Sequence, residues 1–320
     1  MDWSILDEDL KAVETSFQEY LSSRVPLIAK VGKHILNSGG KRIRPVILLL
    51  SSRLNGYGGI RAIRMASIVE FIHTATLLHD DVVDNANIRR GSPAANTLWG
   101  SEASVLVGDF LFSKSFYLMV NDGDLKILNI LAEATTQLAE GEILELVKTG
   151  DLNITNQEYM DLITSKTAVL ISAASRIGAV LGKASEEVEQ ALRDYGLYVG
   201  IAFQLVDDCL DYTATNESLG KMIGTDLREG KVTLPLIISL QYATNDEKKR
   251  IQDIVFSEKI AKENFKEVQL FIQKYSGVEA TLELARKYIE KAKKCLEVSP
   301  VCPEREALED LADFIVQRDR

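Results

Sequence analysis

Two acidic motifs of identical spacing each follow an apolar segment of this chain. The first lies in EFIHTATLLHDDVVDNANIRRG and the second in GIAFQLVDDCLDY; their aspartates are Asp80, Asp81, Asp84, Asp207, Asp208 and Asp211. Helical residues four apart share a face, so the first and last aspartate of each motif point the same way. One such motif alone would more often be a solvated helix face. Because acidic residues in apolar helices cost stability without a ligand, the repetition favours a divalent metal site such as Mg²⁺ shared by two helices.

Basic residues accompany the first motif at two places. Arg89 and Arg90 follow it directly, and the segment GGKRIRP, residues 39–45, precedes it. One guanidinium group can donate two parallel hydrogen bonds to the oxygens of a phosphate, so clustered basic residues are typical of a phosphate site. Basic residues that serve only as surface charges do not need to cluster. Three basic residues in four positions after two glycines therefore indicate an anion-binding loop. Carboxylates for metal beside guanidinium groups for phosphate predict a diphosphate site.

The composition limits the classes of partner and compartment. The chain has 320 residues, 46% of them hydrophobic, and a net charge of −10, which argues against binding nucleic acid. Its three cysteines form no disulfide framework or metal-binding spacing, and Cys209 is best read as a small core residue. The acidic N-terminus lacks a signal-peptide core, and no uninterrupted apolar run spans a bilayer. We expect a soluble cytoplasmic protein, with at most a peripheral membrane contact for product release.

Helical periodicity dominates the sequence, and strand-like alternation is scarce. A capping box at Thr155 and Glu158 predicts a helix that reaches Leu181, and a second box at Thr244 and Glu247 opens another. Three charged amphipathic helices are predicted for the remainder of the chain. The other predicted helices cover residues 5–21, 27–36, 61–84, 101–119, 125–147 and 186–212, with restarts at Pro45 and Pro235 and a cap at Ser101. We predict an all-α fold, with residues 1–320 as one helical-bundle domain around a central apolar cavity.

The motifs occur in an order that is characteristic of one enzyme family. GGKRIRP, HTATLLHDDVVD, RRG, SKTA, FQLVDD and GTDLREGKVTLP follow one another, and agreement extends to the terminal VQRDR. The sequence closely resembles the trans-isoprenyl diphosphate synthases, in particular their long-chain bacterial octaprenyl branch. The resemblance implies the isoprenoid synthase fold and a homodimer. It also implies condensation of an allylic diphosphate, such as farnesyl diphosphate, with successive isopentenyl diphosphates to an all-trans chain for a ubiquinone or menaquinone.

The resemblance also implies a role for each matching position. Asp80 and Asp84 would hold two Mg²⁺ ions on the allylic diphosphate, with Asp81 in support. Asp207 would hold a third ion, with Asp208 and Asp211 completing that side. Asp226 would support the second metal cluster. The allylic diphosphate would be bound by Arg89, Lys166, Lys221 and Lys231, and isopentenyl diphosphate by Lys41, Arg44, His73 and Arg90. Thr167 and Gln204 would lie beside the developing carbocation, with Lys166 at the same catalytic centre.

These residue types suit the reaction. An allylic C–O bond must ionise, and metal ions and fixed cations stabilise the charge that develops on the leaving diphosphate. The homoallylic double bond then attacks the cation, and diphosphate is the plausible base for the final proton loss. Water must be excluded because it would quench the cation. Taken alone, Lys166 could merely snorkel, Gln204 could be a core amide, and His73 could be a packed histidine.

The length of the product is predicted from the residues that precede Asp80. Thr76 lies one helical turn before Asp80, so a chain anchored at the metal site would grow past it. The resemblance implies that short-chain members carry aromatic residues at one or both of positions 75 and 76, whereas this sequence has Ala75 and Thr76. We therefore predict a long product of about eight isoprene units, although small residues here could also serve close helix packing. Phe112, Phe116 and Met119 are candidates for the floor.

Further expectations concern a loop and competing functions. The polar, glycine-bearing segment from Thr213 to Thr233 is predicted to be a lid. Glu70 and His73 form one E-x-x-H element, but the second copy that a di-iron bundle needs is missing. A non-catalytic partner subunit would be expected to have lost its acidic motifs, and a class I terpene cyclase would not need GGKRIRP. A shorter- or longer-chain synthase of the same family is the remaining alternative.

Overall fold

The computed structural model describes residues 4–213, 224–257 and 260–318. Contacts divide the described chain into two compact units. Unit 1 comprises the described residues within 1–135, 170–196 and 295–311, and unit 2 comprises those within 136–169, 197–294 and 312–320. Each unit is therefore built from three separate stretches of sequence, and each contains one of the two acidic motifs.

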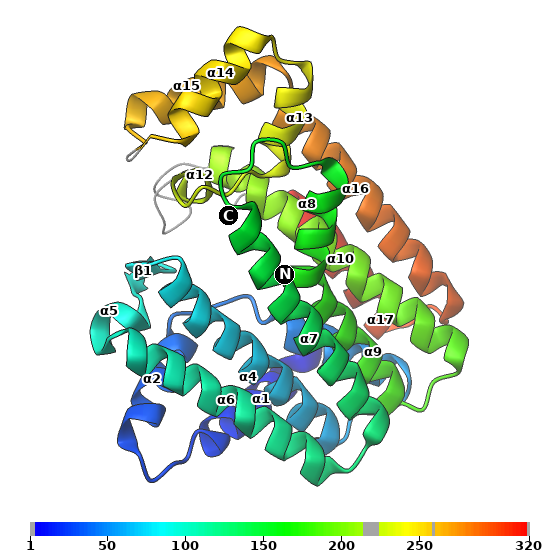
Figure 1. Ribbon diagram of the computed structural model, residues 1–320. Helices are drawn as coiled ribbons and strands as arrows, with labels where there is room; N and C mark the ends of the chain where they lie inside the picture. Colours follow the sequence, from blue (N-terminus) through cyan, green and yellow to red (C-terminus); the bar gives the residue numbers. More distant parts are fainter. Residues whose placement is uncertain (1–3, 214–223, 258–259, 319–320) are drawn as a thin grey trace. The chain divides into compact units, whose positions relative to one another are not determined.

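Unit 1 is organised around one long buried helix, α4 (Ile60–Val83). All eight residues from Met65 to Ile72 are less than 10% exposed, as expected for a helix that is apolar on most sides. Helix α6 (Ser101–Asp122) runs beside it, as Figure 1 shows. The other elements that begin in this part of the chain are η1 (Ser4–Leu6), α1 (Asp7–Tyr20), α2 (Pro26–Asn37), α3 (Ile43–Leu54), β1 (Ile88–Arg89), β2 (Ser92–Pro93) and α5 (Ala95–Trp99).

The core of unit 1 joins α4 to its neighbours through stacked and apolar side chains. The rings of Phe17 in α1 and Phe71 in α4 are parallel, with centroids 4.2 Å apart. Ala75 and Leu78 of α4 extend the same cluster to Leu111 of α6. Close packing of this kind fixes the orientation of α4, and therefore the direction in which its C-terminal aspartates point.

Helix α6 is, among the described residues, the one helix long and apolar enough to cross a membrane by length and composition alone. The sequence predicted no uninterrupted apolar run of that length, and Asp109 and Lys114 do interrupt this helix. Val107 and Leu111 of this helix are buried, whereas Leu106 is 67% exposed and Tyr117 is 62% exposed. The helix thus has one face in the core of unit 1 and one apolar face outside that core.

Unit 2 contains the second half of α7 (Leu125–Lys148) and most of α10 (Glu186–Thr213), helices that begin in unit 1. Between them in sequence lie α8 (Asn156–Ile163), a π-helical turn at Thr164–Ala168 and α9 (Val169–Leu181), and α9 belongs to unit 1 from Leu170 onward. The remaining elements are α12 (Thr225–Arg228), α13 (Leu234–Tyr242), α14 (Asn245–Val255), α15 (Lys262–Lys274), α16 (Gly277–Cys295), η3 (Leu296–Val298) and α17 (Pro303–Gln317), of which η3 and the start of α17 belong to unit 1.

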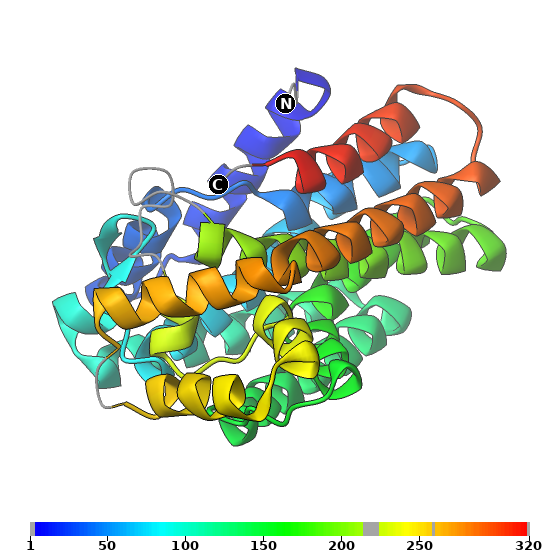
Figure 2. The ribbon, with the colours of Figure 1, turned by 90° about the horizontal axis from the view of Figure 1, so that it is seen from above.

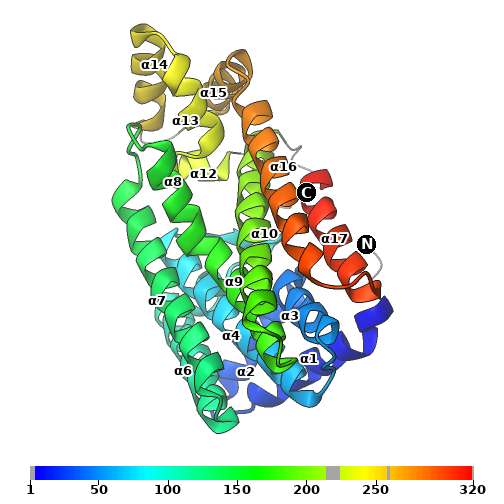
Figure 3. The same cartoon turned by 90° about the vertical axis from the view of Figure 1, so that its right-hand side faces the viewer.

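Helix α16 packs along the part of α10 that carries the second acidic motif. Figures 2 and 3 both show the two helices side by side, α16 in orange and α10 in light green. The rings of Tyr198 and Tyr288 lie 5.9 Å apart, and the Cys209 thiol lies 3.8 Å from the carbonyl oxygen of Val278. Cys209 is 2% exposed, which agrees with its predicted role as a core residue.

Most predicted helix boundaries agree with the structure within a few residues. Both capping boxes are present, with reciprocal hydrogen bonds at Thr155–Glu158 and Thr244–Glu247. The predicted cap at Ser101 is wrong, because Gly100 precedes the helix with a φ of 86° and Ser101 is already helical. The helix predicted from 156 to 181 is interrupted by the π-helical turn. The segment predicted as a loop from 213 to 233 contains α12, and residues 214–223 lie outside the described residues.

Candidate active site

The first acidic motif lies at the C-terminal end of α4. Asp80 and Asp84 are partly exposed, and the backbone N–H of Asp84 closes the helix on the carbonyl of Asp80 at 2.8 Å. Asp81 is different, because its side chain is only 1% exposed and accepts a 2.5 Å hydrogen bond from Nε of Arg89. The β1–β2 ribbon reverses the chain and brings Arg89 back to the helix. Asp81 is thus buried and paired with Arg89, unlike the partly exposed Asp80 and Asp84.

Four arginines act electrostatically on His73, which lies one helical turn before Thr76 and Leu77. Desolvation and the guanidinium groups of Arg44, Arg90, Arg89 and Arg42 hold the pKa of His73 well below its usual value of 6.5. The imidazole is therefore neutral near pH 7 and can act as a hydrogen-bonding group without adding charge. The structure brings together three of the predicted isopentenyl diphosphate residues here, namely Arg44, His73 and Arg90.

The backbone around Gly39 and Gly40 fits this cluster. Arg90 donates from Nη1 to the carbonyl oxygen of Gly39. A Cβ at Gly40, whose φ is 151°, would lie 2.6 Å from Nη1 of Arg90, so a side chain at this position would collide with the guanidinium. Arg42, with a φ of 51°, turns back and pairs with Glu70 at 2.8 Å. Lys41 is exposed beside them.

The two residues predicted to govern product length occupy different surroundings. Ala75 is fully buried in the apolar cluster with Phe17, Phe71 and Leu111. Thr76 is partly exposed, on the same side of α4 as Asp80, and its hydroxyl donates to the carbonyl of His73 at 2.8 Å. Of the predicted floor residues, Phe112 and Phe116 are partly exposed with ring centroids 5.5 Å apart, and Met119 is buried.

The second acidic motif lies on α10, in unit 2. Asp207 pairs at 2.8 Å with Nη2 of Arg318, whose side chain is 3% exposed and whose guanidinium lies 4.0 Å from the centroid of the Phe203 ring. Burial lowers the pKa of Arg318 from its usual value, but the group remains cationic at neutral pH. Asp211 accepts backbone N–H groups from Thr225 and Asp226 at 3.1 Å each, and so anchors the start of α12.

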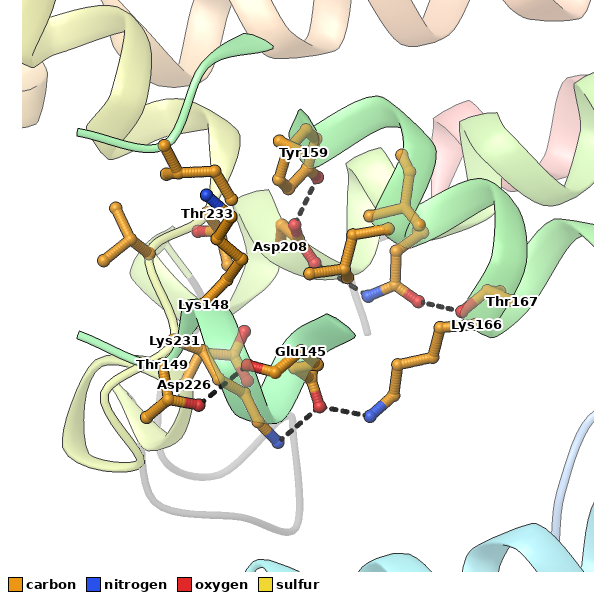
Figure 4. A pocket seen from close by; sticks show the side chains of 15 residues that line it. Glu145, Lys148, Thr149, Tyr159, Lys166, Thr167, Asp208, Asp226, Lys231 and Thr233 are labelled. Carbon is orange, nitrogen blue, oxygen red and sulfur yellow. Dashed lines mark hydrogen bonds and ion pairs between the residues drawn. The ribbon is translucent and has the colours of Figure 1, made fainter. Parts of the chain in front are cut away.

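Asp208 points into unit 2 and is 2% exposed. The Tyr159 hydroxyl donates to its Oδ2, and Nε2 of Gln204 donates to its Oδ1 at 2.7 Å. The Thr167 hydroxyl in turn donates to Oε1 of Gln204 at 2.8 Å, as Figure 4 shows. Burial raises the pKa of Asp208 to about 7, although the two donated hydrogen bonds oppose this shift.

Two predicted diphosphate-binding lysines converge in unit 2. Lys166 lies in the π-helical turn and pairs with Glu142 at 2.9 Å and with Glu145. Lys231 lies 2.8 Å from Glu229 and 3.7 Å from Glu145, so Glu145 lies between the two ammonium groups. Together with Thr167, Gln204 and Asp208 these lysines line a cavity of about 120 Å³ (Figure 4). Lys221 lies outside the described residues.

Gly141 supports this arrangement on the facing helix α7. A Cβ there would lie 2.7 Å from the backbone nitrogen of Lys166. The close approach leaves no room for a side chain, and π-helical turns are frequent at functional sites.

The donor types fit hard divalent cations, which take carboxylate oxygens and commonly share them with substrate phosphates. Within the described residues no three or more His, Cys, Asp or Glu side chains form a group that could hold a metal by themselves. Ligands from a substrate diphosphate would complete the coordination shell. Asp80, Asp84, Asp207 and Asp211 are the partly exposed carboxylates of the two motifs, whereas Asp81 and Asp208 are buried.

Several residues of the site were missed from the sequence. Lys166 is contacted by Glu142 and Glu145, which lie 24 and 21 positions before it. Asp208 is contacted by Tyr159, 49 positions before it, and Asp207 by Arg318, near the end of the chain. The spacing of Glu142 and Glu145 in the apolar segment GEILEL was a usable signal, since it puts two carboxylates on one helix face. Tyr159 and Arg318 gave no comparable signal.

The polyprenyl synthetase family model matches residues 25–271, a range that includes both acidic motifs and every predicted diphosphate-binding residue. The chain belongs to the polyprenyl synthetase family. It is accordingly a polyprenyl diphosphate synthase, a prenyltransferase. Its all-helical structure is of the isoprenoid synthase type, as predicted.

Individual relatives of this synthase agree over nearly its whole length. The octaprenyl diphosphate synthase of Escherichia coli is 44% identical over 98% of this chain and 97% of its own. A crystal structure of a decaprenyl diphosphate synthase from Rhodobacter capsulatus has a TM-score of 0.94 and 43% identity, covering 99% of this chain and 98% of that one. A polyprenyl synthase from Caulobacter crescentus, complexed with calcium and isoprenyl diphosphate, has a TM-score of 0.95 and 42% identity, covering 99% and 97%.

Proposed function

We propose that this synthase elongates farnesyl diphosphate with successive isopentenyl diphosphates to all-trans octaprenyl diphosphate, for the side chain of a ubiquinone or menaquinone. The observation that carries this proposal is the arginine cluster around a neutral His73 on the helix that ends in Asp80 and Asp84. A cluster of guanidinium groups is a site for a diphosphate, and the adjacent carboxylates are ligands for a cation that a diphosphate would share.

The metal is proposed to be Mg²⁺, with three ions bound. Asp80 and Asp84 would hold two of them, and Asp207 the third, with Asp81, Asp211 and Asp226 in support. Asp208 would act on this side only from the interior of unit 2, through its contacts with Tyr159 and Gln204. The relative that was crystallised with calcium and isoprenyl diphosphate supports a hard divalent cation beside the substrate. When bound, such ions neutralise the charge that develops on the leaving diphosphate.

The chain's own cations are proposed to divide between the two substrates. Lys41, Arg44, His73 and Arg90 would bind isopentenyl diphosphate, and Arg89, Lys166, Lys221 and Lys231 the allylic diphosphate. Glu145 holds Lys166 and Lys231 near each other before an anion arrives. An incoming diphosphate would then meet two oriented ammonium groups rather than two freely moving side chains.

Thr167 and Gln204 are proposed to lie beside the allylic cation. Their oxygens carry lone pairs, and a cation in a water-free site is stabilised by such oriented dipoles. The homoallylic double bond of isopentenyl diphosphate attacks the cation, and the released diphosphate takes the proton that is then lost. Exclusion of water prevents the cation from being quenched to an alcohol.

The octaprenyl length rests on Ala75 and Thr76, which leave α4 without an aromatic side chain just before the metal-binding aspartates. Its competitor is a shorter or longer product within the same family. Relatives named for octaprenyl and decaprenyl products have nearly the same identity to this chain, 44% and 43%, so overall identity does not select the length.

We further infer a cytoplasmic homodimer in which residues 1–320 act as one catalytic domain. A single family model spans parts of both compact units, which supports one domain. The exposed apolar side chains of α6, including Leu106, Tyr117 and Val120, are the surface we propose for contact with a second copy. Sedimentation of the wild-type protein and of Val120→Glu tests this, and an unchanged dimer in the variant would place the interface elsewhere.

Two variants test the metal-binding role. Asp80→Ala and Asp207→Ala should each lower turnover by about 10²-fold or more, the scale for losing a principal electrostatic group, while leaving the helical content unchanged. Asp161→Ala, at an exposed position on α8, is the matched control. Near-normal turnover in both folded variants would refute the proposed metal sites.

A further inference from the structure

We propose that Asp208 and Tyr159 are positioning residues that fix the side-chain amide of Gln204 in one orientation for the reaction. The inference deepens the proposed function and rests on it, because that function puts Gln204 and Thr167 beside the allylic cation. It assigns Asp208 a role other than the metal ligation that its place in the acidic motif suggests.

The assignment starts from burial. Asp208 is 2% exposed and Tyr159 is 2% exposed, whereas the side chain of the neighbouring Asp207 is 40% exposed. Both carboxylate oxygens of Asp208 already accept hydrogen bonds, one from the Tyr159 hydroxyl and one from Gln204. A metal ion at Asp208 would have to replace these donors in the interior of unit 2. Asp81 holds the same position in the first motif and is likewise buried and hydrogen-bonded, to Arg89.

The hydrogen bonds form a directed chain from Tyr159 to Thr167. Each oxygen of Asp208 accepts a hydrogen bond, Oδ2 from the Tyr159 hydroxyl and Oδ1 from the amide, so the end of Gln204 that faces Asp208 is its NH₂ group. The carbonyl oxygen Oε1 then faces Thr167, and the Thr167 hydroxyl donates its one hydrogen bond to that oxygen. Figure 4 shows the chain of contacts from Tyr159 through Asp208 to Thr167 at one wall of the cavity.

This direction matters for a cation. With the amide fixed, the lone pairs of Gln204 Oε1 and Thr167 Oγ1 are the electron-rich groups at this wall. A flipped amide would put an NH₂ group, the positive end of the dipole, in place of the oxygen. Asn at position 208 can donate as well as accept, so it would no longer select between the two orientations. Tyr159 acts one step further back, because it holds the Asp208 carboxylate toward Gln204.

The experiment compares Asp208→Asn, Tyr159→Phe and Gln204→Leu in the full-length protein, with Asp161→Asn on the exposed face of α8 as the matched control. Melting temperature and circular dichroism confirm folding. Asp208→Asn should lower kcat by about 10²-fold, the scale for a misplaced group in a reacting pair. Tyr159→Phe should lower it by about tenfold, the scale for one hydrogen bond to a charged group. The KM values for both diphosphates and the Mg²⁺ concentration for half-maximal activity should stay within about twofold of wild type, since no group that binds them has changed.

Two readouts separate positioning from a merely structural role. In the Gln204→Leu background, Asp208→Asn should have little further effect on kcat, because Asp208 acts through Gln204. The fraction of allylic diphosphate that is lost to the prenyl alcohol should rise in Asp208→Asn, since a less stabilised cation is more often captured by water. Asp207→Asn should instead raise the half-maximal Mg²⁺ concentration.

The inference would be overturned if Asp208→Asn and Gln204→Leu lowered kcat independently, so that their effects multiplied in the double variant. It would also be overturned if Asp208→Asn raised the half-maximal Mg²⁺ concentration as much as Asp207→Asn does. If the Asn variant does not fold, Tyr159→Phe in the same double-mutant cycle decides. A wild-type protein without chain-elongating activity would overturn the proposed function and this inference with it, whereas an active wild type with independent effects would overturn the inference alone.

Discussion

Replacement of Arg318 by Met should destabilise the protein and at the same time tighten metal binding. The Arg318 side chain, 3% exposed, pairs with Asp207, donates to the carbonyl of Phe203 at 2.5 Å and covers the Phe203 ring. Met keeps the apolar stem and loses the charge. The two lost hydrogen bonds, to the carbonyls of Phe203 and Ile315, and the lost cation–π contact are each worth about 1 kcal/mol. The ion pair to a carboxylate that is 40% exposed is worth about 1 kcal/mol more. The free energy of unfolding should therefore fall by about 4 kcal/mol.

The metal effect has the opposite sign. In the wild-type protein a cation that binds Asp207 must compete with the guanidinium for that carboxylate. Removal of a pair worth about 1 kcal/mol should lower the dissociation constant of the metal by about fivefold. Binding of Mn²⁺ in the presence of inorganic diphosphate, followed by electron paramagnetic resonance, measures this without turnover. Urea unfolding measures the stability.

Arg305→Met is the matched control for Arg318→Met. Arg305 lies on α17, which ends at Gln317, one residue before Arg318. It is partly buried and pairs with Glu309 and the Ser299 carbonyl, neither of which belongs to an acidic motif. It should lose stability without any change in Mn²⁺ binding. Weaker Mn²⁺ binding in Arg318→Met would show that Arg318 assists the metal site, and would refute the competition argued from the Asp207 contact.

Three further predictions follow from unit 1. Thr76→Phe should shorten the product while sparing the first condensation, as chromatography of the products would show; Ala75→Phe is a poorer test because Ala75 is buried and overpacking costs about 1–3 kcal/mol. Arg44→Ala should raise the KM for isopentenyl diphosphate more than that for the allylic substrate, and equal rises would refute the division of substrates. Because the pKa of His73 is lower in the folded than in the unfolded protein, the unfolded state binds more protons below pH 6.5, and stability should fall as pH falls through that range. His73→Gln should reduce this slope in urea unfolding measured at each pH, and an unchanged slope would exclude His73 as its source.

The sequence was sufficient where the determining interactions are local. The capping boxes at Thr155 and Thr244 join residues three apart, and both were predicted. The spacing of Asp80 and Asp84 places both carboxylates on one face of α4 for the same reason. By contrast, the β1–β2 ribbon has two residues in each strand, too few for an alternating pattern to be visible.

Interactions between distant residues were beyond such reasoning. Nothing in the pattern around Tyr159 indicates a contact with Asp208, 49 residues later, and the equal spacing of the two motifs hides the difference in burial between Asp207 and Asp208. The π-helical turn at Lys166 likewise has no visible sequence signal, and neither does the close approach of Gly141 from another helix to the Lys166 backbone. The chemistry of the site could be predicted from its residue types. The different roles of neighbouring aspartates could not, because they depend on the burial and contacts of each side chain.

The account is tested most directly by incubating the purified protein with farnesyl diphosphate, isopentenyl diphosphate and Mg²⁺ and measuring product length by mass spectrometry after removal of the diphosphate. We predict octaprenyl as the main product, with no elongation when Mg²⁺ is removed by a chelator. A main product of another length would refute the octaprenyl assignment, and the absence of any elongated product with Mg²⁺ present would contradict the proposed elongation of farnesyl diphosphate.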